Sequence, residues 1–272
     1  MAKTVGFVSE KGGVGKTTAC YHIGIALHRF HNKRILVVDG DYQRGGISGR
    51  FFPDVIEAFG SGTITGTTLF HKFQQLYSAT SITSDIDIRT WNGEISVIVA
   101  DPRLSTVSVD KLPSTNNIRE NNRALLRHLG VIRETLRSFA ENYDYILIDS
   151  HPEVSDVLRS IIFASDYLVS PVKLDRQSSI GVATVIAEMN NVNADVEMMR
   201  RGLQEDIDHN DTVFAGTVGM MTREWGGNLK LTEEQEYNRL RRTGPIFRAY
   251  VTEGDGLRQA AAARIPVFDL RG

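Results

Sequence analysis

The sequence predicts an α/β protein: a doubly wound, mostly parallel sheet with helices on both faces. Three observations predict this class. Short apolar runs rich in Val and Ile alternate with segments of helical periodicity along the 272 residues. The first run, residues 4–8, leads directly into a glycine-rich turn and then into a helical pattern. Acidic residues follow two later runs, at the strand ends where open α/β sheets bind ligands.

The elements of the first half follow in order. After the glycine-rich turn, apolar residues recur at helical spacing and predict one buried stripe, formed by Ala19, Ile23, Ala26, Leu27 and Phe30. Residues 34–39 form the next predicted strand. Segment 45–94 is the least regular part, and we expect an irregular insertion there with one helix near residues 68–77.

The second half continues the alternation of strands and helices. Its predicted strands are 95–100, 145–149, 167–172, 213–221 and a short last one at 265–267. Its predicted helices are 119–141, 178–205, 232–242 and 257–263. The run 145–149 is the clearest buried strand in the chain, because all but its first and last residues are aliphatic.

Composition limits the class of protein. With 41% hydrophobic residues and no linker-like stretch, residues 1–272 are predicted to form a single domain around one large core. The single cysteine, Cys20, excludes a disulfide framework and a cysteine-paired metal site within one chain. No signal peptide precedes the first strand and no apolar run approaches the roughly 20 residues of a membrane span, so a cytoplasmic protein is expected.

The glycine-rich turn predicts a site for a nucleoside triphosphate. Its glycines let the backbone point N–H groups at a polyphosphate, Lys16 places a charge on the outer phosphates, and the Thr17 hydroxyl suits a Mg²⁺ position. The strict loop pattern needs a glycine where this chain has Glu10; instead a second lysine opens the loop. The candidate nucleotide-binding residues are Lys11, Gly12, Gly13, Val14, Gly15, Lys16, Thr17 and Thr18.

A lysine at both ends of the loop resembles the deviant Walker A motif of the ParA/MinD family of P-loop ATPases. The resemblance implies that Lys11 reaches across a dimer interface to the nucleotide of the partner. It also implies ATP and Mg²⁺ as cofactors, and a homodimer in the ATP state. Lys11 and Lys16 are therefore both candidate catalytic residues.

The acids after the second strand are similar to the next motif of the family, Asp-x-Asp-Pro-Gln. The chain has Asp39 and Asp41 at the two acidic positions and Tyr42 in place of the proline. The resemblance implies that Asp41 positions or activates the attacking water, and a Mg²⁺ contact by Asp41 is a further expectation. Asp39 is as often a strand-terminal cap as a functional acid in such a place.

Asp149 ends the run 145–149, which has the form of a Walker B strand. An acid there holds Mg²⁺ through a coordinated water, because Mg²⁺ keeps much of its hydration shell. The family usually has two prolines in the switch segment that follows, whereas this chain has His151 and Pro152. His151 either makes the switch respond to pH or is solvated, and a lone loop histidine is more often solvated.

Recognition of the base is less well marked. The resemblance extends through residues 164–181 and 256–267, but the asparagine that the family often places after its later strand is replaced by the segment 220–223. An adenine could stack on Met221. Preference for adenine therefore rests on the resemblance.

The two ends of the chain select a subgroup within the resemblance. Residues 268–272 are too short for the membrane helix of MinD-type members, and no helix-turn-helix segment precedes residue 4. Similarity to the small ParA type implies a nucleoid-associated switch that binds DNA without sequence preference in its ATP state. A ParB-like or other partner would stimulate its slow ATP hydrolysis, to segregate plasmid or chromosomal DNA or to position a protein cargo.

Any DNA contact must come from a local patch, because the net charge is −2. The best candidates are Arg239, Arg241, Arg242 and Arg248, although the acids before them also fit an ordinary solvated helix face.

Two other functions stay open. One is an ATPase adaptor for a secretion or polysaccharide-synthesis complex. The other is a metabolic synthetase with a substrate pocket built by segment 45–94.

Overall fold

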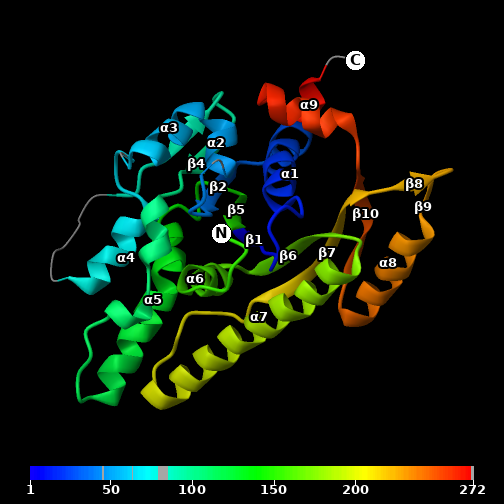
Figure 1. Cartoon of the computed structure of the whole chain (residues 1–272). Coiled ribbons are helices and arrows are strands. Elements are labelled where there is room, and N and C mark those ends of the chain that lie inside the picture. The colour runs from blue at the N-terminus through cyan, green and yellow to red at the C-terminus, as the bar shows by residue number, and fades with distance from the viewer. Residues whose placement is uncertain (45, 63, 79–84, 271–272) are drawn as a thin grey trace.

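The computed structural model describes residues 1–44, 46–62, 64–78 and 85–270. In these ranges it confirms the predicted fold class. An eight-stranded sheet has the order β10-β7-β6-β1-β5-β2-β4-β3, and every neighbouring pair is parallel except β3 with β4 (Figure 1). The strands are β1 (Lys3–Phe7), β2 (Ile35–Gly40), β3 (Arg89–Trp91), β4 (Ile95–Ile98), β5 (Tyr145–Ser150), β6 (Tyr167–Lys173), β7 (Val213–Thr222) and β10 (Ile246–Thr252).

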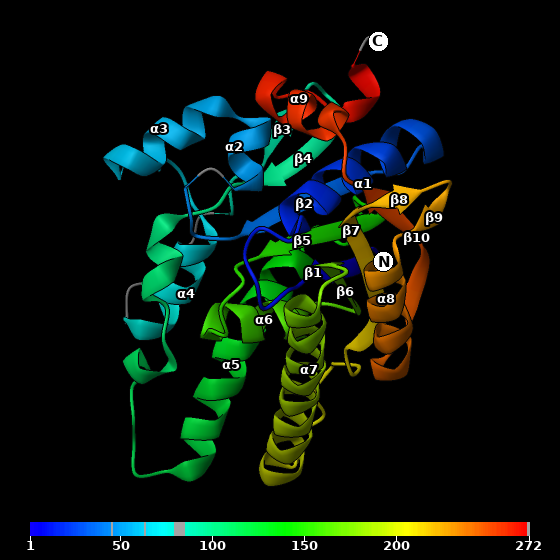
Figure 2. The same ribbon diagram turned by 45° about the vertical axis from the view of Figure 1, so that its right-hand side comes forward.

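Helices cover both faces of this sheet, as Figures 1 and 2 show. One face bears α1 (Lys16–His31), α2 (Ile47–Phe51) and α3 (Pro53–Ser61), with α9 (Asp255–Ala263) beyond α1. The other bears α4 (Leu69–Tyr77), α5 (Ile118–Arg137), α6 (Asp156–Ala164), α7 (Arg176–Leu203) and α8 (Leu231–Thr243). None of the helices in the described ranges combines the length and apolarity that crossing a membrane requires.

Alternation along the buried strands supplies both faces with core residues. In β2, Val37 packs with the α1 side of the core, whereas Leu36 and Val38 pack with the α4–α6 side. Successive side chains of a strand point to opposite faces, so a strand that is covered twice must be apolar at every position. This explains why residues 35–38 and 146–148 lack a polar alternation.

The pairing of β2 with β5 brings together the two predicted acidic sites. Asp39 lies opposite Asp149, and Gly40 lies opposite Ser150. The carboxyl ends of both strands therefore reach the same edge of the sheet, next to the loop that follows β1. The fold thus concentrates the predicted site residues of three segments in one place.

The predicted strand at 265–267 is wrong. Val267 begins a 3₁₀ turn, η3 (Val267–Asp269), and the last parallel strand is instead β10. Most side chains of β10 are partly or fully exposed, because it lies at the edge of the sheet. Its hydrophobic signal is therefore weak, and no strand was predicted there. Before β10, a small hairpin joins β8 (Glu224–Trp225) to β9 (Asn228–Leu229).

Segment 45–94 is more regular than predicted. It contains α2, α3, α4 and β3, and the predicted helix near 68–77 is confirmed as α4. Proline at the first position of α3 and Gly62 after its end, at φ +69°, are common helix boundaries. Residues 45, 63 and 79–84 of this segment lie outside the described part of the chain.

The predicted buried stripe of α1 is partly wrong. Ala19 and Ile25 are buried with Tyr21 in the core, but Ile23 and Phe30 are exposed. Phe30 packs instead against Phe268 near the C-terminus, with ring centroids 5.2 Å apart. The stripe is rotated because β2, β4 and β5 all contact this helix, which the spacing of its own residues does not reveal.

A buried histidine on the other side of the core gives a test of the packing. His209 stacks on Phe163 with ring centroids 4.1 Å apart, and neither ring nitrogen has a hydrogen-bond partner among the described residues. Burial, together with the smaller effect of the charges of Arg133 and Arg200, lowers the pKa of His209 to about 4. The folded chain therefore holds this ring neutral.

Stability should decrease as the pH falls through this range. An unfolded histidine takes up a proton near pH 6.5, while the folded one resists protonation until about pH 4. The contribution of neutral His209 to the free energy of unfolding is complete above pH 6.5. Up to about 3 kcal/mol of it is lost as the pH falls to 4. Denaturant unfolding at pH 7.5 and 4.5 should show a smaller loss in His209→Phe than in the natural chain. An equal loss of unfolding free energy in both proteins would contradict the assignment of this pH dependence to His209.

Candidate active site

The loop between β1 and α1 has the conformation that phosphate binding requires. Gly13 and Gly15 adopt positive φ angles of 72° and 93°, which disfavour any residue with a side chain. Gly15 is also the N-cap of α1, so the free N–H groups at the start of this helix face the loop. A Cβ atom on Gly15 would lie 3.0 Å from the Met220 side chain, which shows how closely the loop packs on β7.

The two lysines of the loop lie in different environments. Lys16, the first residue of α1, is buried. Lys11 is partly exposed, and its Nζ donates a hydrogen bond to Gln177 Oε1 at the start of α7, 2.6 Å away. Lys16 thus belongs to the interior of its own site, while Lys11 lies at the surface beside a different helix.

The remaining candidate residues of the loop vary in exposure. Gly12 and Gly13 are exposed and Val14 is buried, while Thr17 and Thr18 are partly buried in the first turn of α1. The exposed glycines leave the phosphate side of the loop open. The side chain of Val14 is instead shielded from solvent.

Asp149 has the properties of a magnesium-associated acid. Its side chain is fully buried at the end of β5, and neither carboxylate oxygen has a hydrogen-bond partner among the described residues. Burial raises the pKa of Asp149, and the nearby charge of Lys16 opposes this rise. A hard cation satisfies such oxygens, and Mg²⁺ commonly takes one or two carboxylates together with phosphates and waters. The residues therefore fit the metal that the sequence analysis expected.

The carboxylate of Asp39 holds two neighbouring stretches of backbone in place. Its Oδ2 accepts the backbone N–H of Ser48 at the start of α2, 2.8 Å away, and its Oδ1 accepts the N–H of Asp41 at 3.0 Å. Burial raises the pKa of Asp39, and the charge of Asp149 raises it further. Asp39 thus fixes α2 and the turn that carries Asp41, which favours the cap that the sequence left as one of two alternatives.

Asp41 and His151 form a buried pair. The Nδ1 atom of His151 lies 2.8 Å from Oδ1 of Asp41, and the imidazole stacks on the ring of Tyr42 with centroids 4.0 Å apart. The expectation that His151 is a solvated loop residue is wrong, because its side chain is 2% exposed. The sequence could not reveal this, since the contact joins loops after two different strands.

Arg50 is a residue of this region that the sequence analysis missed. It lies on α2, and its Nη2 donates a hydrogen bond to Thr18 Oγ1, 2.9 Å away. Burial lowers the pKa of Arg50, and the negative charge of Asp149 opposes that effect. No motif marks this arginine, because it comes from segment 45–94 and reaches the loop only through the packing of α2 on α1.

The structure brings Met220, rather than Met221, against the phosphate loop. Met220 is buried beside Gly15, while Met221 is partly buried and has a positive φ of 53° near the end of β7. Met221 lies in the same hydrophobic group as the loop-facing side of α1. Its stacking on an adenine stays a prediction.

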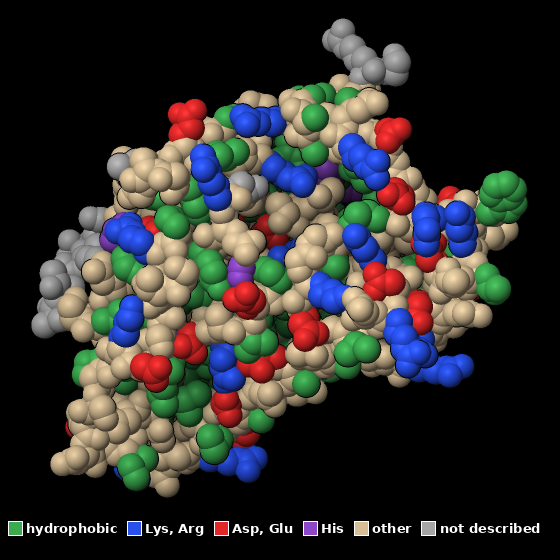
Figure 3. All heavy atoms as spheres, in the orientation of Figure 1, with side chains coloured by type: hydrophobic (Ala, Val, Ile, Leu, Met, Phe, Trp, Pro, Cys, Tyr) green, Lys and Arg blue, Asp and Glu red, His purple; other side chains and the backbone are tan. Residues whose placement is uncertain are grey.

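The four candidate DNA-binding arginines lie on two adjacent elements. Arg239, Arg241 and Arg242 are exposed on α8, and Arg239 forms an ion pair with Glu236 at 3.5 Å. Arg248 is exposed on β10, where it lines a hollow of about 450 Å³ together with α8 residues such as Tyr237. Figure 3 shows Lys and Arg side chains over α8 and the β8–β9 hairpin, interspersed with acids.

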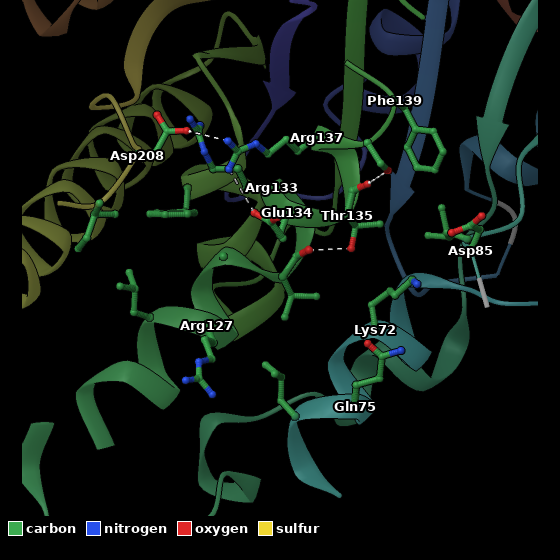
Figure 4. Close-up of a pocket in the computed structure, with 18 residues that line it drawn as sticks. Lys72, Gln75, Asp85, Arg127, Arg133, Glu134, Thr135, Arg137, Phe139 and Asp208 are labelled. Carbon is green, nitrogen blue, oxygen red and sulfur yellow. Dashed lines mark hydrogen bonds and ion pairs between the residues drawn. The ribbon is translucent and has the colours of Figure 1, made fainter. Parts of the chain in front are cut away.

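A cavity of about 620 Å³ lies away from this site. It is lined by α4, by the second half of α5 and by residues 207–208 before β7, and Figure 4 shows Arg137 beside Glu134 and Asp208 at its rim. Its lining includes Phe139, which precedes β5, but no residue of the phosphate loop. The cavity thus lies toward the amino ends of the strands, opposite the edge that holds Asp41 and Asp149.

The chain is similar to known proteins in sequence and in fold. A family model described as an AAA domain, AAA_31, matches residues 2–201. The sporulation initiation inhibitor protein Soj of Bacillus subtilis is 28% identical over 190 residues, which are 68% of this chain and 64% of that protein. The chromosome-partitioning ATPase Soj of Thermus thermophilus is 26% identical over 196 residues, 71% of this chain and 63% of that protein. The match thus spans less than two thirds of the length of these relatives.

A solved structure shares the fold over a larger part of the chain. The complex of Cyanothece McdA with ATP superposes with a TM-score of 0.72 at 17% identity, covering 98% of this chain and 90% of that one. At this identity the likeness shows a common fold.

Proposed function

We propose a function from the premise that this chain belongs to the ParA/MinD family of P-loop ATPases, whose AAA_31 model matches residues 2–201. The chain is an ATP-dependent switch that forms a homodimer with ATP bound. The dimer binds DNA without sequence preference and dissociates after slow, partner-stimulated hydrolysis. The named activity of the Thermus relative, chromosome partitioning, supports segregation of DNA or positioning of a cargo on the nucleoid.

The separation of the two lysines is the observation that most supports this switch. Lys16 is buried in its own site, whereas Lys11 projects to the surface and is bonded to Gln177. A surface lysine at the entrance of a phosphate loop can neutralise phosphate charge on a second molecule. Lys11 would exchange its bond to Gln177 for that contact when two ATP-bound chains meet face to face.

The buried acids and Lys16 support hydrolysis of ATP by in-line attack of water. Lys16 compensates charge on the β- and γ-phosphates, and the glycine N–H groups hold the phosphates in place. Asp41 orients the attacking water, which is most of what phosphoryl transfer asks of the protein. Mg²⁺, held near Asp149 and Thr17, would neutralise the charge that develops between the phosphates. Regulation by dimer formation follows, because each site is incomplete without the partner's Lys11.

The arginines of α8 and β10 are the proposed DNA surface. Arg241 and Arg242 form no ion pair among the described residues, and Arg248 lies on the adjacent strand. Clustered arginines that contact phosphates give binding that depends steeply on salt and little on sequence. The net charge of −2 makes this local patch the expected source of affinity.

A DNA-binding measurement tests the proposal. Purified protein is titrated with a random-sequence duplex with ATP, with ADP and without nucleotide, at two salt concentrations. We expect tight, salt-sensitive binding with ATP alone, and at least a tenfold weaker affinity in Lys11→Ala, because the variant lacks the cross-dimer contact.

Lys33→Ala is the matched control, because this lysine lies outside the loop, after α1. It should bind DNA as the natural chain does. ATP binding without DNA binding in any state would contradict the switch and favour an adaptor of a secretion or polysaccharide-synthesis complex. The synthetase alternative needs a substrate pocket beside the phosphates, but the 620 Å³ cavity faces the other edge of the sheet.

A further inference from the structure

One oxygen of Asp41 is held by two donors. Oδ1 accepts the backbone N–H of Gln43 at 2.9 Å and lies 2.8 Å from Nδ1 of His151. Oδ2 receives no hydrogen bond from the described residues. An ionised carboxylate can only accept, so the Nδ1 atom of His151 must carry the hydrogen that joins the two side chains.

The strand register explains why these side chains meet. Gly40 of β2 lies opposite Ser150 of β5, so Asp41 and His151 are the next residues as the two strands leave the sheet together. Adjacent parallel strands keep such residues within side-chain contact. The contact therefore depends on the core of the sheet rather than on a mobile surface loop.

Packing limits the rotation of the imidazole. Tyr42 stacks on one face of His151 at an interplanar angle of 28°, and the ring is 2% exposed. The other charged neighbour, Glu153, has an oxygen 3.6 Å from Nε2 but is 77% exposed, so solvent screens its effect. Asp41 and Tyr42 thus determine the orientation of the ring. Tyr42 and His151 each replace a proline of the family pattern, and the two replacement side chains stack on each other.

We propose that His151 is a positioning residue for hydrolysis: it fixes Oδ1 of Asp41 and leaves Oδ2 as the single oxygen that orients the attacking water. This inference rests on the proposed ATPase function. Without the imidazole, the carboxylate can turn about its terminal bond and exchange its oxygens. Water would then meet the acid in several orientations, of which few are in line with the γ-phosphate.

Two substitutions of His151 separate hydrogen bonding from packing. His151→Phe keeps a ring on Tyr42 but removes Nδ1, whereas His151→Asn removes the ring but keeps an N–H near the same place. We expect kcat to fall about tenfold or more in His151→Phe and to stay within about threefold in His151→Asn, with KM for ATP unchanged in both. His209→Phe is the matched control, because it also replaces a buried, stacked histidine and should keep the natural kcat.

The opposite ranking would overturn the inference. If His151 only fills space, His151→Phe is harmless and His151→Asn is damaged in stability and KM. A double-mutant comparison adds a second test: in an Asp41→Asn background, His151→Phe should cause no further loss of kcat, because its effect passes through Asp41. Losses that multiply in the double variant would show that His151 acts independently.

A measurement without turnover keeps the inference separate from the proposed function. The Nδ1 atoms of His22 and His28 lie 2.9 Å from backbone carbonyl oxygens, so long-range ¹H–¹⁵N spectra should show these rings protonated at Nδ1 as well. The signal of His151 is the Nδ1-protonated ring that is absent in His151→Phe and shifted in Asp41→Asn. A His151 ring that carries its hydrogen on Nε2 alone would overturn the positioning role even if ATP is hydrolysed. A natural chain that shows the Nδ1 signal but no more hydrolysis than Lys16→Gln would overturn the ATPase function instead.

Discussion

Lys16→Gln is expected to lose ATP binding by about 100-fold or more, because removing one member of a buried charge contact costs roughly 2–5 kcal/mol. Glutamine keeps most of the length of the side chain but not its charge. The buried position of Lys16 at the first turn of α1 leaves no neighbouring lysine in the loop to replace it, since Lys11 points to Gln177. Titration with a fluorescent ATP analogue measures the effect.

The same substitution should also destabilise the chain without nucleotide. The charge of Lys16 is the main one that opposes the rise in the pKa of the buried Asp149, so its removal leaves that acid less compensated. Adding Asp149→Asn should restore the melting temperature but not ATP binding. Restored binding in the double variant would show that Lys16 serves only to compensate Asp149. Lys33→Ala is the control, because this lysine lies after α1 and outside the loop; its melting temperature and ATP affinity should be those of the natural chain.

Asp41→Asn is expected to bind ATP normally and to hydrolyse it 100-fold or more slowly, since a positioned acid or base contributes about 10²–10⁴ to a rate. Asparagine keeps an oxygen that can accept from Gln43 and His151, so the turn after β2 should persist. What disappears is the negative charge beside the attacking water. Single-turnover hydrolysis and ATP affinity measured on one preparation separate the two effects.

The variant should also accumulate in the ATP-bound dimer, which sedimentation can detect. Asp54→Asn is the matched control, because Asp54 is an exposed acid that pairs with Arg89 on the surface. Its hydrolysis should equal that of the natural chain. If Asp41→Asn hydrolyses ATP at a rate within threefold of that of the natural chain, a residue other than Asp41 must orient the attacking water.

Much of the fold followed from local patterns. The phosphate loop, the strand 145–149 and the helices that became α4, α5, α7 and α8 were predicted close to their observed bounds. These elements are marked by glycine geometry and by periodicity, which are properties of neighbouring residues. The edge strand β10 and the helices α2 and α3 were not predicted, because exposed or short elements bury too little apolar surface to leave a clear pattern.

The residues of the candidate site also form two groups: those that motifs in the sequence predicted and those whose contacts only the structure revealed. The sequence by itself marked Lys16 and Asp149 as the candidates for holding phosphate and magnesium, because they occur in motifs whose chemistry is local. Only the tertiary structure decided that Asp39 anchors α2, that Arg50 reaches Thr18, and that His151 holds Asp41. These contacts join side chains from separate segments, and strand register and helix packing set them. No spacing along the chain encodes such a distance, since it exists only after the sheet has formed.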